Sequence, residues 1–226
     1  MSISAEPRKH CSIRRAGPRD DTILFLATAT PIGRLHLAAS PHGIVRIELP
    51  LPSAEACLNL WLAMHFPNAT RRRGMSPILR KAATQLEAYF TGGLRAFSLP
   101  LDLAGTPFQV AVWQTVAAIP FAETRSYRDV AISVGKEKAL RAVGAAQGAN
   151  PVPIVVPCHR VIGSDGKLTG YGGGLPTKRW LLDHERELVG LSPASASWAL
   201  DEQRSQRASD NRQLSWWGDR PKPSTP

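Results

Sequence analysis

Apolar and polar positions alternate in three short runs near the start of the chain, at residues 23–28, 35–39 and 44–49. Alternation over runs of this length predicts strands with one buried face. Short segments containing proline and glycine, at 31–33 and 41–43, separate the runs. Because so short a connection can join only antiparallel neighbours, the pattern predicts an antiparallel meander.

Two helices are expected after the meander. The first covers residues 53–65 and begins at Ser53, a residue type that can cap a helix. The second begins at Ser76-Pro77, a cap followed by a first-turn proline, and ends at the Thr-Gly-Gly of residues 91–93. Together with the three strands, these helices predict a small α/β unit.

The second half of the chain has mainly helical signals. An extended piece at residues 97–101 leads to a helix that Thr106-Pro107 caps and Pro120 ends. We therefore expect two domains, an α/β domain with a small antiparallel sheet at residues 21–100 and a mainly α-helical domain at residues 101–190.

Residues 126–134 and 137–147 predict two helices around a turn at Gly135, which is helix-turn-helix spacing. Arg141 is the only long side chain in an otherwise small-residue stretch of the second helix. The small residues are Ala139, Ala142, Gly144, Ala145, Ala146 and Gly148. Such a surface suits close backbone approach to a groove with little base readout, whereas a major-groove reader needs longer side chains. The alternative is a small-residue helix packed tightly against a neighbouring helix.

The chain is basic, with 28 Lys and Arg residues against 18 Asp and Glu residues and a net charge of +10 over 226 residues. Nine basic and three acidic residues lie between 125 and 179, which favours a polyanionic partner there. Arginines 71–73 are expected in a solvated loop. The arginine-rich residues 1–20 and the Ser-, Pro- and Gln-rich residues 191–226 are expected to form a disordered arm and a disordered extension.

Three cysteines, Cys11, Cys57 and Cys158, have unrelated spacings and form no disulfide framework. A reducing compartment fits this usage, and we expect a cytoplasmic protein. The chain has no apolar run long enough for a membrane span, and its basic start lacks the apolar core of a secretion signal. His10, Cys11 and Cys57 match no standard zinc spacing, so no metal is expected.

Candidate chemistry lies at Cys158-His159, directly after the apolar run 153–156 and Pro157. The run predicts a strand, which the proline ends because it lacks a backbone donor. A thiol beside an imidazole at such a break is typical of an activated nucleophile. The alternative is a structural cysteine, since free cysteine is among the most buried residue types.

A carboxylate completes the arrangement. The predicted helix at 176–189 carries an apolar stripe, and Glu185 lies four residues after Leu181 and three before Leu188. Glu185 therefore faces the core, where a carboxylate needs a donor such as an imidazole N–H. We expect Glu185 to hold His159, which then activates Cys158 either directly or through a water.

Five ordered motifs lie at residues 119–127, 141–144, 150–151, 157–161 and 170–175. With them, the chain resembles the O6-alkylguanine-DNA alkyltransferase family, closely over residues 85–187 and more weakly over 21–84. The resemblance implies a ribonuclease-H-like first domain without nuclease activity, and a stand-alone protein without the zinc regulatory domain of some members.

The resemblance implies DNA repair by direct, stoichiometric transfer of an alkyl group to Cys158. The substrate would be double-stranded DNA with O6-alkylguanine, and also O4-alkylthymine, whose base is flipped through the minor groove. It implies a monomer that needs no cofactor.

The resemblance also assigns roles to individual residues. Arg141 would fill the space left by the flipped base, Tyr127 would protonate the leaving guanine, and Asn150 would hold the turn near the cysteine. The implied catalytic residues are Cys158, His159, Glu185, Tyr127 and Asn150. The implied DNA-binding residues are Arg141, Ala139, Ala142, Gly144, Ala145, Gln147 and Arg160. The implied pocket residues are Tyr171, Gly172, Val161 and Pro153.

The chain departs from the family pattern at three positions. Ala122 stands where the family usually has glycine, Leu140 where alanine is commoner, and Gly172 where many members carry serine. The sequence argues against three other classes of protein. A non-catalytic alkyltransferase-like protein would lack Cys158, a zinc-cysteine regulator would need a cysteine cluster, and a papain-like hydrolase would need a different context around its cysteine.

Overall fold

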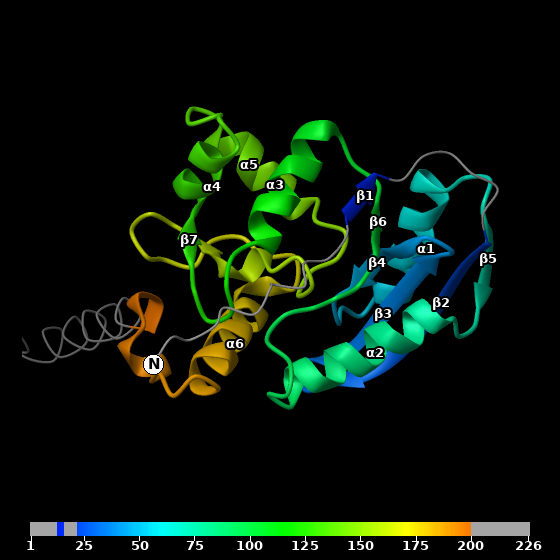
Figure 1. The fold of residues 1–226 in the computed structure, drawn as a ribbon, viewed down its shortest axis with the longest axis horizontal. Coiled ribbons are helices and arrows are strands. Elements are labelled where there is room, and N and C mark those ends of the chain that lie inside the picture. The colour runs from blue at the N-terminus through cyan, green and yellow to red at the C-terminus, as the bar shows by residue number, and fades with distance from the viewer. Residues whose placement is uncertain (1–12, 16–21, 200–226) are drawn as a thin grey trace, which may run out of the picture.

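The computed structural model describes residues 13–15 and 22–199. A six-stranded sheet with helices α1 and α2 forms one part of the molecule, and helices α3 to α6 form the other (Figure 1). The predicted arm 1–20 and extension 191–226 fall largely outside the described residues. Within the described residues, no helix is both long and apolar enough to cross a bilayer.

The sheet has the order β1-β6-β4-β3-β2-β5. Its centre is the predicted antiparallel meander of β2 (Thr22–Thr30), β3 (Gly33–Ser40) and β4 (Gly43–Glu48). The sheet as a whole is mixed rather than antiparallel, because β6 runs parallel to β1 and β4, and β5 runs parallel to β2.

The added strands lie at the two edges of the sheet. Arginines 71–73, expected in a loop, belong to β5 (Thr70–Arg73), where an edge position leaves their side chains exposed. At the other end, β6 (Leu101–Leu103) pairs with β1 (Ile13–Arg15), which belongs to the predicted arm. The sequence did not predict either edge strand because each depends on a distant partner.

The two helices of this part cover opposite faces of the sheet. Leu58 of α1 (Ala54–His65) clusters with Ala38 and Val45, whereas Leu86 of α2 (Pro77–Phe90) clusters with the alternate strand positions such as Leu37. The Ser76 hydroxyl caps α2 by accepting the Leu79 N–H at 3.2 Å. Ser53 precedes α1 without a side-chain cap, since its hydroxyl lies 3.5 Å from the Cys57 sulfur instead.

The second part is mainly helical, as predicted, with α3 (Pro107–Ala117), α4 (Tyr127–Ser133), α5 (Leu140–Gly148) and α6 (Gly174–Glu187). Capping boxes at Thr106 and Ser126 start α3 and α4. α5 begins three residues later than expected, because residues 137 and 138 form a turn. One hydrophobic cluster contains residues of α2, the sheet, α3 and α5, so a continuous core joins the two parts.

Residues 191–199 belong to the predicted extension but fold back on α6. A 3₁₀ turn (Pro193–Ser195) leads to Trp198, which is 6% exposed and clusters with Leu182. The indole N–H of Trp198 donates to Asp183 at 3.0 Å, and the Arg186 guanidinium lies over the ring. The tryptophan supplies the apolar area that the Ser- and Pro-rich composition concealed.

Candidate active site

The segment before Cys158 is a closed turn and not the predicted strand. Pro153 and Val156 form an isolated bridge, and Ile154 has a φ of +74°. Asn150 holds the turn, because its amide nitrogen donates to the Val156 carbonyl at 2.8 Å and its amide oxygen accepts the Val152 N–H at 3.0 Å. Three prolines within 151–157 deny this stretch the donors of a strand.

Cys158 follows as the first residue of a 3₁₀ turn (Cys158–Arg160), and its sulfur meets the same asparagine. The Asn150 amide donates to Sγ at 3.2 Å, and the cysteine is 8% exposed. Burial raises the pKa of the thiol, although the Asn150 hydrogen bond and the Lys178 charge oppose this rise. The resting residue is therefore a thiol at neutral pH.

His159 and Glu185, predicted to pair, are in contact. The His159 Nε2 and Glu185 Oε1 atoms lie 2.8 Å apart, and both side chains are fully buried. Burial alone would raise the pKa of Glu185, but the charges and hydrogen bonds of His159 and Arg160 hold it well below its usual range. Glu185 is thus an ionised acceptor, and the imidazole must donate through Nε2.

This hydrogen bond determines the histidine tautomer. Burial lowers the pKa of His159 below its usual range, while the charge of Glu185 opposes the decrease. A neutral imidazole that donates through Nε2 keeps Nδ1 as a free acceptor. Nδ1 is buried and has no hydrogen-bond partner among the described residues. The nitrogen that a base would use is therefore the available one.

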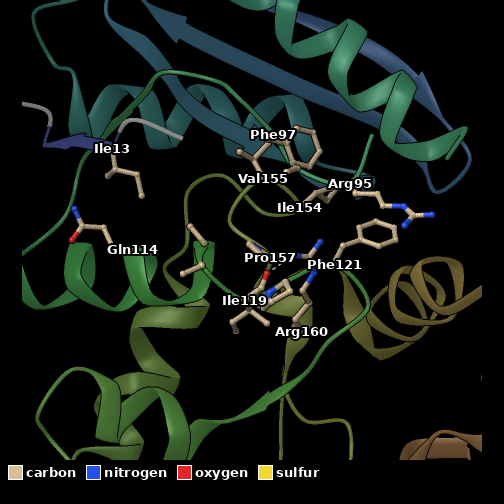
Figure 2. Close-up of a pocket in the computed structure, with 14 residues that line it drawn as sticks. Ile13, Arg95, Phe97, Gln114, Ile119, Phe121, Ile154, Val155, Pro157 and Arg160 are labelled. Carbon is tan, nitrogen blue, oxygen red and sulfur yellow. Dashed lines mark hydrogen bonds between the residues drawn. The ribbon is translucent and has the colours of Figure 1, made fainter. Parts of the chain in front are cut away.

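Arg160 differs from its prediction as a DNA-binding residue. It is 5% exposed, its Nε and Nη2 donate to Glu185 at 2.9 Å, and its Nη1 donates to the Ile119 carbonyl at 2.7 Å. Figure 2 shows Arg160 beside Phe121 at the wall of a cavity of about 650 Å³ between the two parts of the molecule. The guanidinium neutralises a buried carboxylate, so it cannot also reach a phosphate.

Helix α5 presents a small-residue surface to solvent. Arg141, Ala142 and Ala145 are exposed, whereas Val143 and Ala146 are buried in the core. Arg141 makes no hydrogen bond or ion pair with the described residues, so its guanidinium is available for a ligand. Added Cβ atoms at Gly144 and Gly148 would meet nothing within 4 Å, so these glycines are not required for internal packing.

Two of the predicted DNA-binding residues occupy other positions. Gln147 is 7% exposed and faces inward, because it follows Val143 by one helical turn. Ala139 is the residue before α5 rather than a helical residue, and it is half-buried. The exposed surface of α5 therefore lacks two of the residues that were predicted to bind DNA.

The remaining predicted catalytic and pocket residues lie at the start of α4 and in the segment that follows the cysteine. The Tyr127 hydroxyl donates to the Thr169 carbonyl at 3.5 Å, and the buried hydroxyl of Tyr171 has no partner among the described residues. Val161 begins strand β8 (Val161–Ile162), which pairs with β7 (Arg125–Ser126). Gly172 is exposed, with open space where a Cβ would be.

Lys178 belongs to this region and was not predicted. Its Nζ donates to the Val161 carbonyl at 2.6 Å and the Thr169 carbonyl at 2.7 Å. Burial lowers its pKa to about 8, although the nearby Cys158 opposes the decrease. A signal for it existed, since Lys178 lies seven residues before Glu185 and shares the buried stripe of α6.

No group of three or more metal-ligating side chains occurs within residues 13–15 and 22–199. His10 and Cys11, whose spacing matches no standard zinc pattern, lie outside the described residues.

Comparisons with known proteins extend over both parts of the chain. Residues 23–103 match the 6-O-methylguanine DNA methyltransferase ribonuclease-like domain, and residues 107–187 match the DNA-binding domain of the same name. A methylated-DNA–protein-cysteine methyltransferase of Mycobacterium tuberculosis is 56% identical over 157 residues, which are 70% of this chain and 88% of that protein. A constitutive Bacillus subtilis protein of that name is 42% identical over 163 residues, 72% of this chain and 94% of its own.

Solved structures match as well. The crystal structure of the M. tuberculosis O6-methylguanine methyltransferase superposes with a TM-score of 0.63 at 42% identity, covering 74% of this chain and 94% of that one. The M. tuberculosis protein in complex with DNA also gives 0.63, at 41% identity and with 73% of this chain and 94% of that one covered.

Proposed function

This chain belongs to the 6-O-methylguanine DNA methyltransferase family, and on that premise we propose that it repairs O6-alkylguanine in double-stranded DNA. The alkyl group passes to Cys158, which keeps it, so each molecule reacts once. The observation that carries this proposal is the sulfur of Cys158, held by Asn150 beside a buried Glu185–His159 pair. The complex of the M. tuberculosis protein with DNA supports the choice of partner.

The first step activates the thiol. His159 takes the proton of Cys158 on Nδ1 through a water, since no direct hydrogen bond joins the two side chains. Glu185 stabilises the imidazolium that results. The thiolate is the nucleophilic form of cysteine, and it attacks the alkyl carbon on O6.

The second step balances the charge on the base. A carbon–sulfur bond forms as the carbon–oxygen bond breaks, and the departing guanine gains electron density. Tyr127 donates its hydroxyl proton to the base, and its position beside the Thr169–Lys178 contact supports this role. The thioether that remains on Cys158 is not hydrolysed by these groups, so the protein is consumed.

A guanine inside a duplex cannot reach a sulfur that is 8% exposed, so the base leaves the helix. Helix α5 lies in the minor groove, where its exposed alanines permit close approach. Arg141, which makes no hydrogen bond or ion pair with the described residues, occupies the space vacated by the base. Backbone groups near Val161 and Gly172 meet the purine edge, while Pro153 and Tyr171 form the walls.

We further propose that O4-alkylthymine is also a substrate. We propose that the protein acts in the cytoplasm as a monomer and needs no cofactor. Gly172 supports the wider substrate range, because a Cβ at this position would meet nothing within 4 Å and the glycine leaves this space open. Cys57 and Cys158 are unpaired, which fits a reducing compartment. The presence of Cys158 argues against a protein that binds alkylated DNA without repairing it.

Intact-mass measurement after mixing with O6-methylguanine duplex tests this function. We expect a gain of one methyl group per molecule on Cys158, and no gain in Cys158→Ala. Cys57→Ala is the matched control and should react like the wild type, because Cys57 lies on α1, away from the site. Methyl transfer to Cys57, or repair of more than one lesion per molecule, would contradict the proposal.

A further inference from the structure

Tyr89 connects the ribonuclease-like domain to Glu185, the carboxylate that holds His159. It lies on α2, is fully buried, and donates its hydroxyl to Glu185 Oε1 at 2.7 Å. Its ring contacts Phe97 of the same domain, and Phe121 and His184 of the other. Among the described donors to this carboxylate, Tyr89 is the one that comes from the first domain.

The hydroxyl acts on the oxygen that also holds the histidine. Oε1 accepts His159 Nε2 at 2.8 Å and Arg160 Nη2 at 2.9 Å, whereas Oε2 accepts the Ala122 N–H at 3.0 Å. Burial, followed by the charge of Glu185, raises the pKa of Tyr89 well above its usual value. The Tyr89 hydroxyl therefore keeps its proton, and remains a hydrogen-bond donor, at neutral pH.

We infer that Tyr89 is a positioning residue for the alkyl transfer and acts through Glu185 on His159. Its hydroxyl fixes the place of Oε1, and this fixes the plane of the imidazole that must take the thiol proton. It also draws negative charge from Oε1, which limits how strongly the carboxylate favours the imidazolium. The inference rests on the proposed function and gives the first domain a part in it.

A purely structural tyrosine is the alternative. The aromatic contacts of Tyr89 belong to its ring, and phenylalanine would keep them. A structural role therefore predicts that Tyr89→Phe changes stability alone. A positioning role predicts that the same substitution also changes the basicity of His159, a property that ring packing does not control.

The test compares Tyr89→Phe with Ser98→Ala. The Ser98 hydroxyl accepts a hydrogen bond at 2.7 Å from Gln85, which lies on α2 like Tyr89. Ser98 makes no hydrogen bond with Glu185, so Ser98→Ala removes a hydrogen-bonded hydroxyl without affecting the carboxylate. The rate of transfer from free O6-benzylguanine to Cys158 is measured between pH 5 and 8, with the His159 pKa read by ¹⁵N NMR and assigned with His159→Asn. Urea unfolding gives the folded fraction of each variant.

For Tyr89→Phe we expect a rate about tenfold lower at pH 7.5, because the imidazole is held less firmly. We also expect a higher His159 pKa and an acid limb displaced to higher pH, since Oε1 has lost a donor. Ser98→Ala should keep the wild-type rate and pH profile. A Tyr89→Phe protein with the wild-type His159 pKa, whatever its stability or rate, would overturn the inference.

The two proposals fail in different ways. If the wild-type protein transfers no alkyl group to Cys158, the proposed function is wrong, whereas the His159 pKa still reports whether Tyr89 acts on the histidine. If the wild-type protein is active and Tyr89→Phe matches it in rate and His159 pKa, only the inference about Tyr89 is wrong.

Discussion

Glu185 is a carboxylate in a position where an unpaired charge would be costly. It has no exposed surface, yet it is surrounded by donors from His159, Arg160, Tyr89 and the Ala122 backbone. A buried ion is tolerated when its lone pairs are satisfied, and removal of a partner costs several kcal/mol because the charge is then uncompensated. This set of bonds keeps Glu185 ionised, so that His159 keeps its proton on Nε2.

The pKa shifts predict the pH dependence of alkyl transfer. Burial keeps the His159 pKa below its usual value of about 6.5, so the imidazole is already a neutral base at pH 7. The rate with O6-benzylguanine should be nearly constant from pH 7 to 8 and should fall only below about pH 6.5. Single-turnover rates across pH 5–8 measure this, and an acid midpoint above 6.5 would contradict it.

Glu185 and His159 should also make the free energy of unfolding decrease as the pH falls. Glu185 and His159 both have lowered pKa values in the folded protein, so the unfolded chain binds more protons as the pH falls. Their contribution is complete near neutrality and is lost under acid conditions. Urea unfolding at each pH therefore separates loss of the base from loss of the fold.

Ala122 predicts a stabilising substitution. It has a φ of +62°, a left-handed conformation that costs an alanine about 1–2 kcal/mol, while its N–H donates to Glu185. Ala122→Gly should remove this strain, and after the entropy of the added glycine we expect a gain of about 0.5–1 kcal/mol in the free energy of unfolding. Urea denaturation measures the change.

Ala83→Gly is the matched control for Ala122→Gly. Ala83 lies within α2, where glycine should cost about 1 kcal/mol in unfolding free energy. Opposite signs for the two variants would identify the backbone conformation as the cause. A loss of stability in Ala122→Gly would show that the side chain of Ala122 matters more than its φ.

The sequence could predict the contact between Glu185 and His159, but not the contacts of the same carboxylate with Tyr89 and Arg160. Glu185 was found because the α6 stripe placed it in the core, where a donor was required. Tyr89 is 96 residues from Glu185, and nothing in the pattern of α2 distinguishes its hydroxyl from that of any buried tyrosine. The family resemblance implied a DNA-binding role for Arg160, and no pattern in the sequence indicated that its guanidinium pairs with the buried Glu185.

Among the elements, the turn before Cys158 shows why local propensity was misleading. Residues 153–156 have the composition of a strand, but a strand also needs partners, and here Asn150 supplies bonds that close the segment on itself. This closure places the Asn150 amide against the sulfur. The error in the predicted element thus lies where the sequence is shaped by the site rather than by a sheet.

The exposed Arg141 of α5 predicts that one substitution slows repair of duplex DNA without slowing the reaction with a free base. Arg141 is exposed and has no hydrogen bond or ion pair within the described part of the chain, so Arg141→Ala should leave the rate with free O6-benzylguanine within about twofold of wild type. The rate with O6-methylguanine duplex should fall about 10²-fold, because the vacancy left by a flipped base is no longer filled. Arg80→Ala, which removes an exposed arginine from α2, is the charge-matched control and should change neither rate. Equal losses on both substrates would contradict this role.

At the scale of the whole molecule, the continuous core explains how the first domain can affect chemistry in the second. Leu86 of α2 and Val116 of α3 belong to one buried cluster, and Tyr89 extends from it to Glu185. Such a core holds the domains in a fixed relation, which a hydrogen bond of 2.7 Å between them requires. The order of the two domains was predictable because proline and glycine residues mark the ends of their elements. The packing of both domains into one core was not predictable from the sequence.

The charge of the molecule predicts how salt should act. Arg125, Arg128, Lys136, Lys138 and Arg141 are exposed around α4 and α5, and the chain carries +10 overall. If about four phosphates are neutralised, affinity for a duplex should fall roughly 10²-fold between 50 and 200 mM salt, because counterions are no longer released as favourably. The rate with O6-benzylguanine, which carries no phosphate, should change by less than about twofold, since the buried pairs at Glu185 are little screened. Duplex affinity and the free-base rate measured in the same buffers give both quantities, and a parallel decrease would place the effect of salt in the active site instead of on the basic surface.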